Sequence, residues 1–298
     1  MEINAAALTL LNKHLTTVFN KAFAEAPSYY QKLAMIVPSN TGEEQYGWLK
    51  ATPALREWVG DRIVHNLATE GFKLRNLEFE ATVAIRRTAI EDDSYGIYSP
   101  ILQQMGADAA QHPDKLILPL LKNGFTSLCY DGQNFFDTDH PVGGAGDEPV
   151  ASVSNHGGGS GTAWFLLDCS QPVKPLVFQD RMRPALTPLT GETEENVFWR
   201  GEYVYGVRAR SNAGYGLWQL AYGSKQPLDA TNYAAARAAM MSVKKDNGQP
   251  RDIRPTHLVV PPSLEAAGLA VLKATQDAAG ATNVWAGTAE LIVSSLVA

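Results

Sequence analysis

Apolar residues recur at helical spacing near the start of the chain. They lie three or four positions apart within residues 3–25, which places them on one face of a helix. Pro27 ends the pattern. The pattern predicts an amphipathic helix that packs either on the chain's own core or, as an arm, on another chain. The positions are Leu8, Leu11, Leu15, Val18, Phe19 and Ala22.

The clearest strand pattern covers residues 72–90. Every second residue is apolar between positions 77 and 85, and most residues between them are polar. Because successive side chains of a strand point to opposite faces, this alternation predicts a half-buried antiparallel strand. The apolar positions are Leu77, Phe79, Ala81, Val83 and Ile85.

A helix is predicted to follow this strand. Ser99 is a favourable N-cap, and Pro100 is favourable at the first helical position. Pro113 interrupts the apolar pattern before Gly124 ends it. The sequence therefore predicts either one long, kinked helix or two stacked helices.

The second half of the chain carries shorter patterns. Seven glycines within residues 143–161 predict a flexible loop and a domain boundary. The order of elements beyond it predicts an α+β or α/β module. Strands are expected at 125–130 (paired with 133–136 as a hairpin), 164–167, 175–178, 196–208, 256–260 and 289–293, and helices at 229–245 and 263–273.

Residues 39–72 predict a long hairpin-like loop. Short extended pieces, broken by Pro53 and Gly60, carry Trp48 and Trp58. An isolated hairpin is marginal in water, whereas burying one Trp contributes at most about 4–6 kcal/mol. The tryptophans therefore need a surface that either their own domain or another chain supplies, and Trp with Arg is typical of interface anchors. The candidate contact residues are Tyr46, Trp48, Leu55, Arg56, Trp58, Asp61 and Arg62.

Composition narrows the function classes. The 298 residues suffice for one large domain or two smaller ones, and charged residues make up only 19%. A net charge of -6 argues against a protein that coats nucleic acid but allows one that surrounds it. Cys129 and Cys169 form no CxxC pair, which favours a reducing compartment. We expect neither a secretion signal nor a membrane helix.

Three short motifs could carry chemistry. Asp137, Asp139 and His140 offer ligands for a divalent metal, and the alternative function would be a metal-dependent hydrolase that uses them. A turn explains them better, because Pro141 forces His140 to be extended and turns it away from Asp139. The segment 156–159 lacks the serine elbow of an esterase, and the acids at 91–93 suit a helix start. We expect no catalytic residue, cofactor or metal.

Several motifs resemble one protein family. Residues 129–142, CYDGQNFFDTDHPV, closely resemble a signature of the Mu-like phage major head subunits. Further similarities follow in the same order along nearly the whole chain. They include residues 46–49, 55–62, 79–80, 90–93 with Gly96, 205–210, 216–221, 254–262 and 285–291.

The resemblance implies an α+β fold of the Hong Kong 97 capsid type. The expected parts are an N-terminal arm (1–38), an extended loop (39–72), a peripheral domain with a spine helix (73–142), a glycine-rich linker (143–162) and an axial domain (163–298). The last strand of the chain, expected at 289–293, is a candidate to return from the axial domain to the peripheral domain.

The resemblance also implies a function. The chain would be the major capsid protein of a tailed double-stranded DNA phage or prophage, not an enzyme. It would assemble with copies of itself into hexamers and pentamers, with a scaffold protein, a portal and decoration proteins as further partners. It would enclose DNA without sequence-specific binding or a membrane, in a virion assembled in the bacterial cytoplasm. The other alternative is a nanocompartment shell protein of the same fold.

Overall fold

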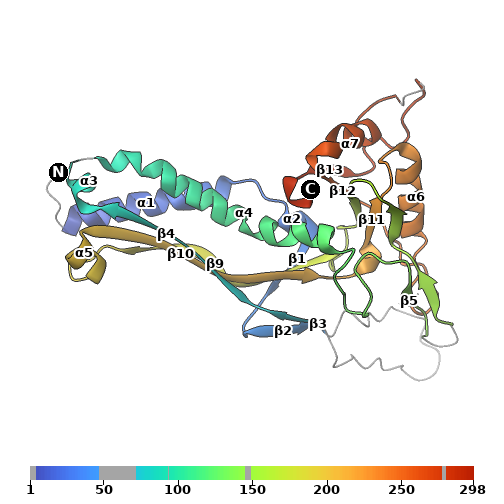
Figure 1. The fold of residues 1–298 in the computed structure, drawn as a ribbon, viewed down its shortest axis with the longest axis horizontal. Helices are drawn as coiled ribbons and strands as arrows, with labels where there is room; N and C mark the ends of the chain where they lie inside the picture. The colour runs from blue at the N-terminus through green and yellow to red at the C-terminus, as the bar shows by residue number, and fades with distance from the viewer. Residues whose placement is uncertain (1–4, 47–71, 93, 145–148, 277–279) are drawn as a thin grey trace.

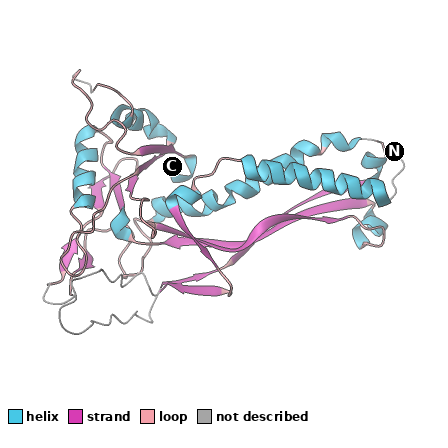
Figure 2. Ribbon diagram, turned by 180° about the vertical axis from the view of Figure 1, so that it is seen from behind, coloured by secondary structure: helices cyan, strands magenta, loops and turns pink. Residues whose placement is uncertain are grey.

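The computed structural model describes residues 5–46, 72–92, 94–144, 149–276 and 280–298. An elongated part joins a compact part at one end (Figure 1). We call the elongated part the arm; it includes much more of the chain than the predicted N-terminal arm of residues 1–38. In the arm, two long helices lie along a twisted sheet. In the compact part, a second sheet is flanked by shorter helices. From behind, the long strands run beneath the helices from the compact part to the tip of the arm (Figure 2).

Helices α1 (Ala5–Glu25) and α4 (Ser99–Asn123) form the helical layer of the arm. None of the helices in the described ranges is long and apolar enough to cross a membrane. The other helices are α2 (Tyr30–Leu33), α3 (Arg87–Glu91), α5 (Glu195–Arg200), α6 (Ala230–Met241) and α7 (Glu265–Leu272). Single 3-10 turns are η2 (Ser94–Ile97), η3 (Trp218–Leu220), η4 (Pro262–Leu264) and η5 (Ser295–Val297).

Two sheets carry most of the strands. The arm sheet has the order β1-β9-β10-β4, and the sheet of the compact part has the order β13-β12-β8-β11-β7. The arm strands are β1 (Ala34–Pro38), β4 (Leu77–Arg86), β9 (Leu176–Leu189) and β10 (Glu202–Tyr215). The strands of the compact part are β7 (His156–Gly159), β8 (Trp164–Leu167), β11 (Ala221–Lys225), β12 (His257–Val260) and β13 (Glu290–Val293). Two-stranded pairs are β2 (Glu43–Tyr46) with β3 (Phe72–Arg75), and β5 (His140–Val142) with β6 (Ala151–Val153).

The structure confirms the first helix and the antiparallel strand β4. It also shows α4 as one helix that continues through Pro113 and Pro119, although each proline removes a helical N–H. Tertiary contacts hold this region. The buried carboxylate of Asp114 accepts the backbone N–H groups of Tyr29 and Tyr30 at 2.8 Å and 2.7 Å. The helix begins one residue after Tyr98, so the predicted N-cap, Ser99, is its first residue.

Two predictions beyond residue 124 are wrong. Residues 195–200 form helix α5 instead of the start of a strand, and Gly201, with φ 62°, ends it in the left-handed conformation. The expected hairpin of 125–130 with 133–136 is reduced to one bridge between Leu128 and Asn134.

The described part of the glycine-rich segment is not a free linker. Strand β7 pairs in parallel with β11 at the edge of the five-stranded sheet. A Cβ atom on Gly157 would lie 2.6 Å from Ser224 Oγ, and one on Gly159, which has φ 88°, would collide with the backbone of Lys225. These glycines therefore allow close packing of the backbone on β11.

The arm draws on both halves of the sequence. Strands β9 and β10, from the range expected to form an axial domain, pair with each other, and β10 pairs with β4 along ten residues. The expected boundary at residue 163 therefore does not coincide with a boundary between the two sheets. Strand β13 pairs with β12 in the compact part, while η5 after it packs on α4, where Lys122 donates to the carbonyl of Ala298.

Three apolar clusters form the core. One lies in the arm under α1 and α4 and includes Leu15, Ile85 and Tyr205. A second fills the junction between arm and compact part, with Leu121 and Trp218 among its members. The third lies in the compact part around β8, β12 and α6. The clusters together connect the arm to the compact part.

Helices α1 and α4 approach each other closely at Gly106. A Cβ atom there would collide with the carbonyl oxygen of Phe19 and would lie 3.1 Å from the Cβ of Ala22. Any side chain at position 106 must therefore push the two helices apart.

We expect Gly106→Ala to destabilise the subunit by about 1–3 kcal/mol, because the added methyl group overpacks this contact. Helix propensity alone predicts the opposite sign, a gain of about 1 kcal/mol. Urea unfolding of the unassembled subunit measures the change. Gly42→Ala is the control, because nothing lies within 4 Å of a Cβ atom at that position. A stabilised Gly106→Ala variant would show that the helices do not meet here.

Candidate assembly surfaces

Six of the seven predicted contact residues lie outside the described residues: Trp48, Leu55, Arg56, Trp58, Asp61 and Arg62. The seventh, Tyr46, is in β2 and only 3% exposed. Its hydroxyl donates to Oε1 of Gln179 at 2.7 Å, and burial raises its pKa. Tyr46 therefore belongs to the chain's own core and anchors the start of segment 47–71.

The base of that segment is held firmly against the arm sheet. Strands β2 and β3 pair from Glu43 with Arg75 to Tyr46 with Phe72, so the described residues that flank segment 47–71 lie side by side. The buried amide of Gln179 donates to the carbonyl of Leu74 and to Oδ1 of Asn76, at 3.2 Å and 2.8 Å. The two flanking strands are therefore attached to β9.

The turn before β2 is closed by the carboxylate of Glu44. It accepts the backbone N–H groups of Asn40 and Thr41 at 3.0 Å and 3.2 Å and the hydroxyl of Ser39 at 3.0 Å. Several hydrogen bonds hold the pKa of Glu44 below its usual range, and the one from the N–H of Asn40 has the largest effect. This turn therefore fixes the direction in which the chain leaves β1 of the arm sheet and enters β2.

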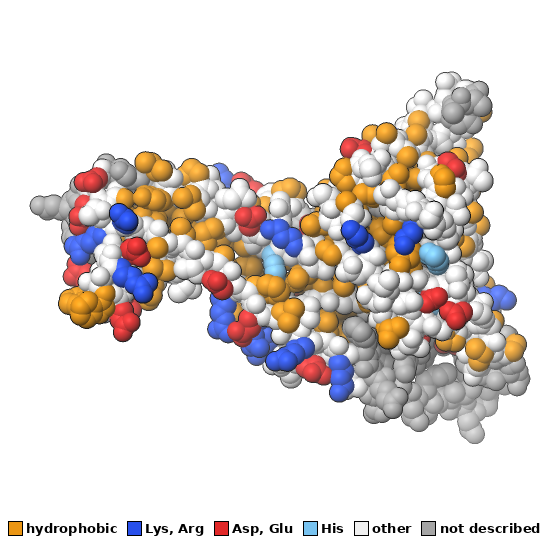
Figure 3. All heavy atoms as spheres, in the orientation of Figure 1, with side chains coloured by type: hydrophobic (Ala, Val, Ile, Leu, Met, Phe, Trp, Pro, Cys, Tyr) orange, Lys and Arg blue, Asp and Glu red, His pale blue; other side chains and the backbone are white. Residues whose placement is uncertain are grey.

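An exposed aromatic pair occupies the tip of the arm. Phe198 and Trp199 on α5 are 70% and 78% exposed, with ring centroids 5.0 Å apart at 88°. Figure 3 shows hydrophobic side chains gathered at this tip. A shallow pocket beside Trp199 is lined by Leu189, Glu194 and Arg200, among others. Two adjacent aromatic side chains in water are typical of a surface that a partner covers. We call this pair the tip surface.

An apolar groove of about 280 Å³ lies between α4 and the sheet, lined by Phe79, Met105 and Val207, among others. The apolar face of β4 is buried at the C-terminal end of the strand, where Ile85 is 1% exposed. At the N-terminal end the face is open, and Leu77 is 46% exposed. The strand pattern correctly predicted an apolar face, but part of that face remains open in the single subunit.

The signature segment 129–142 folds around the carboxylate of Asp131. The thiol of Cys129 donates to Oδ1 at 3.0 Å, and Nδ1 of His140 donates to Oδ2 at 2.7 Å. The backbone N–H of Gln133 also donates to Oδ1, at 3.0 Å. His140 is fully buried and stacks on Trp218, with ring centroids 3.9 Å apart.

Burial raises the pKa of Asp131, but the hydrogen bonds from His140, Cys129 and Gln133 outweigh it and hold the pKa below its usual range. Burial raises the pKa of the Cys129 thiol, which therefore keeps its proton. Cys129, Asp131 and His140 each place one potential metal ligand within 4.8 Å of the others. Their mutual hydrogen bonds account for this geometry as a network that fixes the loop.

The structure does not join the three residues of the hydrolase hypothesis. His140 contacts Asp131, whereas Asp139 is exposed, as the extended backbone at Pro141 predicted. Asp137 accepts the N–H groups of Thr138 and Asn134 at 2.8 Å and 3.2 Å. The carboxylate of Asp137 thus serves the turn, and the carboxylate that contacts His140 is Asp131, which the metal hypothesis did not include.

A buried amide ties this loop to the sheet of the compact part. Asn155 accepts the backbone N–H of Asp137 at 2.9 Å and donates to the carbonyls of Phe135 and Trp218 at 2.8 Å and 3.3 Å. The carbonyl of Asn155 accepts the N–H of Gly223 on β11. The glycine-rich segment therefore holds the signature loop in place.

We expect Asp131→Asn to destabilise the subunit by about 2–3 kcal/mol near neutral pH, because hydrogen bonds to a charged group are lost. Because the pKa of Asp131 is lower in the folded state than in the unfolded state, where it is about 3.9, the ionised carboxylate stabilises the folded protein above this pH. The stabilisation is lost as the pH falls through the folded-state pKa. The difference between wild type and variant should therefore shrink below about pH 4. Urea unfolding at several pH values measures it. The exposed Asp139→Asn is the control, and a pH-independent difference would contradict the charged network.

The whole chain matches known capsid proteins. A family model described as the Mu-like prophage major head subunit gpT matches residues 8–297. The major capsid protein of Escherichia phage Mu is 41% identical over 289 residues, 95% of each chain. The Mu-like prophage FluMu major head subunit of Haemophilus influenzae is 41% identical over 261 residues, 86% of this chain and 85% of that protein.

Solved structures agree. The chain from the procapsid of bacteriophage JBD30 superimposes with a TM-score of 0.89 at 43% identity, covering 99% of this chain and 100% of that chain. The chain from the JBD30 capsid gives 0.76 at 31% identity, covering both chains fully. These likenesses confirm the Hong Kong 97 type of capsid fold. The chain belongs to the Mu-like prophage major head subunit family, a family of capsid proteins with no known enzymatic activity.

Proposed function

We propose that the chain is the shell subunit of a tailed double-stranded DNA phage head and forms hexamers and pentamers that close into an icosahedron. The tip surface carries this proposal. Phe198 and Trp199 lie at the far end of the arm, away from the compact part, and are mostly exposed. An arm of this shape reaches a neighbour while the compact part stays in its own capsomer, and repeated heterologous contacts of this kind close into rings.

Segment 47–71 supplies a second contact in this proposal. It follows β2, precedes β3 and contains Trp48, Trp58 and two arginines. We propose that Trp48, Leu55, Arg56, Trp58, Asp61 and Arg62 lie against a neighbouring subunit. The apolar groove between α4 and β4 suits such a segment, because it offers an open hydrophobic wall.

The proposal includes other partners. A net charge of -6 suits a shell that encloses DNA without binding it by sequence, because few phosphates are neutralised. A chain of the JBD30 capsid decorated with minor capsid protein trimers matches at TM-score 0.74 and 32% identity, which supports a decoration protein here too. A scaffold protein and a portal complete the set, and assembly takes place in the host cytoplasm before the subunit becomes part of the virion.

Negative-stain electron microscopy of the purified protein tests this proposal. We expect rings of subunits or closed shells, with closure favoured by the scaffold protein. Subunits that remain monomeric at high concentration, even with the scaffold protein present, would overturn it.

We expect Trp199→Ala and Trp58→Ala to reduce shell formation far more than subunit stability. Interface anchors of this type contribute about 2 kcal/mol or more, a factor of roughly thirty in affinity. Shell yield by light scattering and urea unfolding of the subunit measure the two effects. Trp218→Ala is the contrast, because Trp218 is 1% exposed and its loss should unfold the subunit. Equal loss of folding and assembly in the Trp199 or Trp58 variant would refute its role as a contact.

A further inference from the structure

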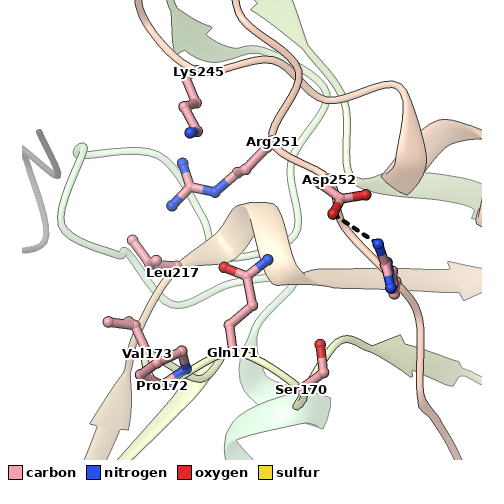
Figure 4. Close-up of a pocket in the computed structure, with 9 residues that line it drawn as sticks. Ser170, Gln171, Pro172, Val173, Leu217, Lys245, Arg251 and Asp252 are labelled. Carbon is pink, nitrogen blue, oxygen red and sulfur yellow. Dashed lines mark hydrogen bonds and ion pairs between the residues drawn. The ribbon is translucent and has the colours of Figure 1, made fainter. Parts of the chain in front are cut away.

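A pocket of about 620 Å³ opens in the compact part, away from the tip surface and the groove. It lies between the segment after β8, the start of η3 and the loop that joins α6 to β12 (Figure 4). One wall is apolar and the other carries basic side chains. The lining residues used below are Pro172, Val173, Leu217, Lys245, Arg251 and Arg254.

A tight loop brings the two key cations together. Lys244 and Pro250 form an antiparallel bridge, and Lys245 donates its N–H to the carbonyl of Gln249 at 2.8 Å. Gly248, with φ 76°, closes the turn by donating to the carbonyl of Lys245. Figure 4 shows the ammonium group of Lys245 beside the guanidinium of Arg251, both over the pocket.

The backbone next to this pair is strained. Asp252 has φ 54°, a conformation that L side chains adopt at a cost of about 1–2 kcal/mol. Ile253 after it is buried, while Asp252 itself pairs with Arg254 at 3.0 Å. Such strain persists where the surroundings impose it and is concentrated at functional sites.

Within the described ranges, the structure shows no salt bridge for Lys245 or Arg251. Nε of Arg251 is buried without a hydrogen-bond partner. The negative charge of Asp246 acts on Arg251, but its carboxylate accepts the N–H of Gly143 at 3.2 Å and makes no salt bridge with either cation in the described residues. Two adjacent cations with an unsatisfied buried donor are unfavourable unless an anion joins them.

The shape of the pocket selects the kind of anion. Val173, Pro172 and Leu217 form an apolar wall beside the cations, which suits the methylene groups of an acidic side chain whose carboxylate meets the two cations. Phosphates of DNA are usually contacted by an exposed basic face, whereas this pocket is recessed and has Asp252 in its lining. Copies of this chain are rich in suitable groups, with 31 acidic against 25 basic residues.

We infer that this pocket receives a glutamate or aspartate side chain from a second copy of the chain in the assembled shell, with the carboxylate held between Lys245 and Arg251. The inference rests on the proposed self-assembly and adds to it a specific polar contact. Such a contact favours one register between subunits, because a misplaced neighbour would leave the cations unpaired.

Carbodiimide cross-linking tests the inference directly, because this reagent joins an amine to a carboxylate that lies in contact with the amine. Shells assembled without DNA from a mixture of unlabelled and nitrogen-15-labelled full-length chains are cross-linked and analysed by mass spectrometry. We expect mixed-isotope peptides that join Lys245 to an Asp or Glu of another copy. The exposed Lys244 is the matched control, and Lys245 should react about five times more often across copies, because only its amine lies in the proposed contact.

Charge reversal gives the second measurement. Arg251 is partly buried and its variants could misfold, so we use Lys245→Glu against Lys244→Glu. The Lys245 variant should raise the concentration needed for shell assembly by about tenfold or more, with unchanged urea unfolding, whereas the Lys244 variant should change it less than about twofold.

The outcomes separate this inference from the proposed function. Normal shells whose Lys245 cross-links only within its own chain, or no more than Lys244 does, would overturn the pocket contact alone. An assembly defect of Lys245→Glu that appears only when DNA is present would also overturn it, in favour of a phosphate contact. A failure of wild-type chains to form shells would instead refute the proposed function.

Discussion

The pairing of β9 with β10 is the constraint on which the rest of the structure depends. Each strand has fourteen residues, a length of about 45 Å, and their ladder runs from Val204 and Leu189 in the arm to Tyr215 and Leu176 at the junction. Helices α1 and α4 cover this ladder, and β2 and β3 attach to it through Gln179. This ladder therefore fixes the shape of the arm from its tip to the junction with the compact part.

The sequence predicted only fragments of that ladder. Pro184 and Pro188 and several charges interrupt β9, so the pattern indicated a strand over 175–178 alone. Strand β9 tolerates these prolines because its second partner, β1, ends opposite Asp180, and beyond that point β9 is an edge strand. An edge position is a property of the sheet, which local periodicity does not contain. The helix α5 was missed for a different reason: alternation around Phe198 favoured a strand, although Gly201 was an available stop signal.

The same division applies to the functional residues. The family resemblance identified the fold and the capsid function, and the two tryptophans of segment 47–71 supplied a physical reason to expect a partner. The centre of the signature loop was not readable, because Asp131 reaches His140 only after the turn at 129–133 folds the chain back. The exposure of Phe198 and Trp199 likewise depends on tertiary placement, whereas Lys245 and Arg251 are brought together by a local turn that the sequence pattern did not indicate.

Buried polar groups and exposed apolar groups have separate roles in this subunit. Gln179 and Asn155 lie where different segments of the chain meet, and each is hydrogen-bonded within the chain. Asp131 has the same role inside the signature loop, where it accepts from His140. A shift of these contacts would leave such a group unsatisfied, so these residues favour one internal geometry more than they add stability. Phe198 and Trp199 are mostly exposed in the described part of the subunit and therefore add little to its stability, and in the proposed shell another chain removes their apolar surface from water. In the proposed shell, a subunit whose internal geometry is fixed in this way reaches its lowest free energy when a neighbour covers the tip surface, which favours assembly of subunits that have already folded.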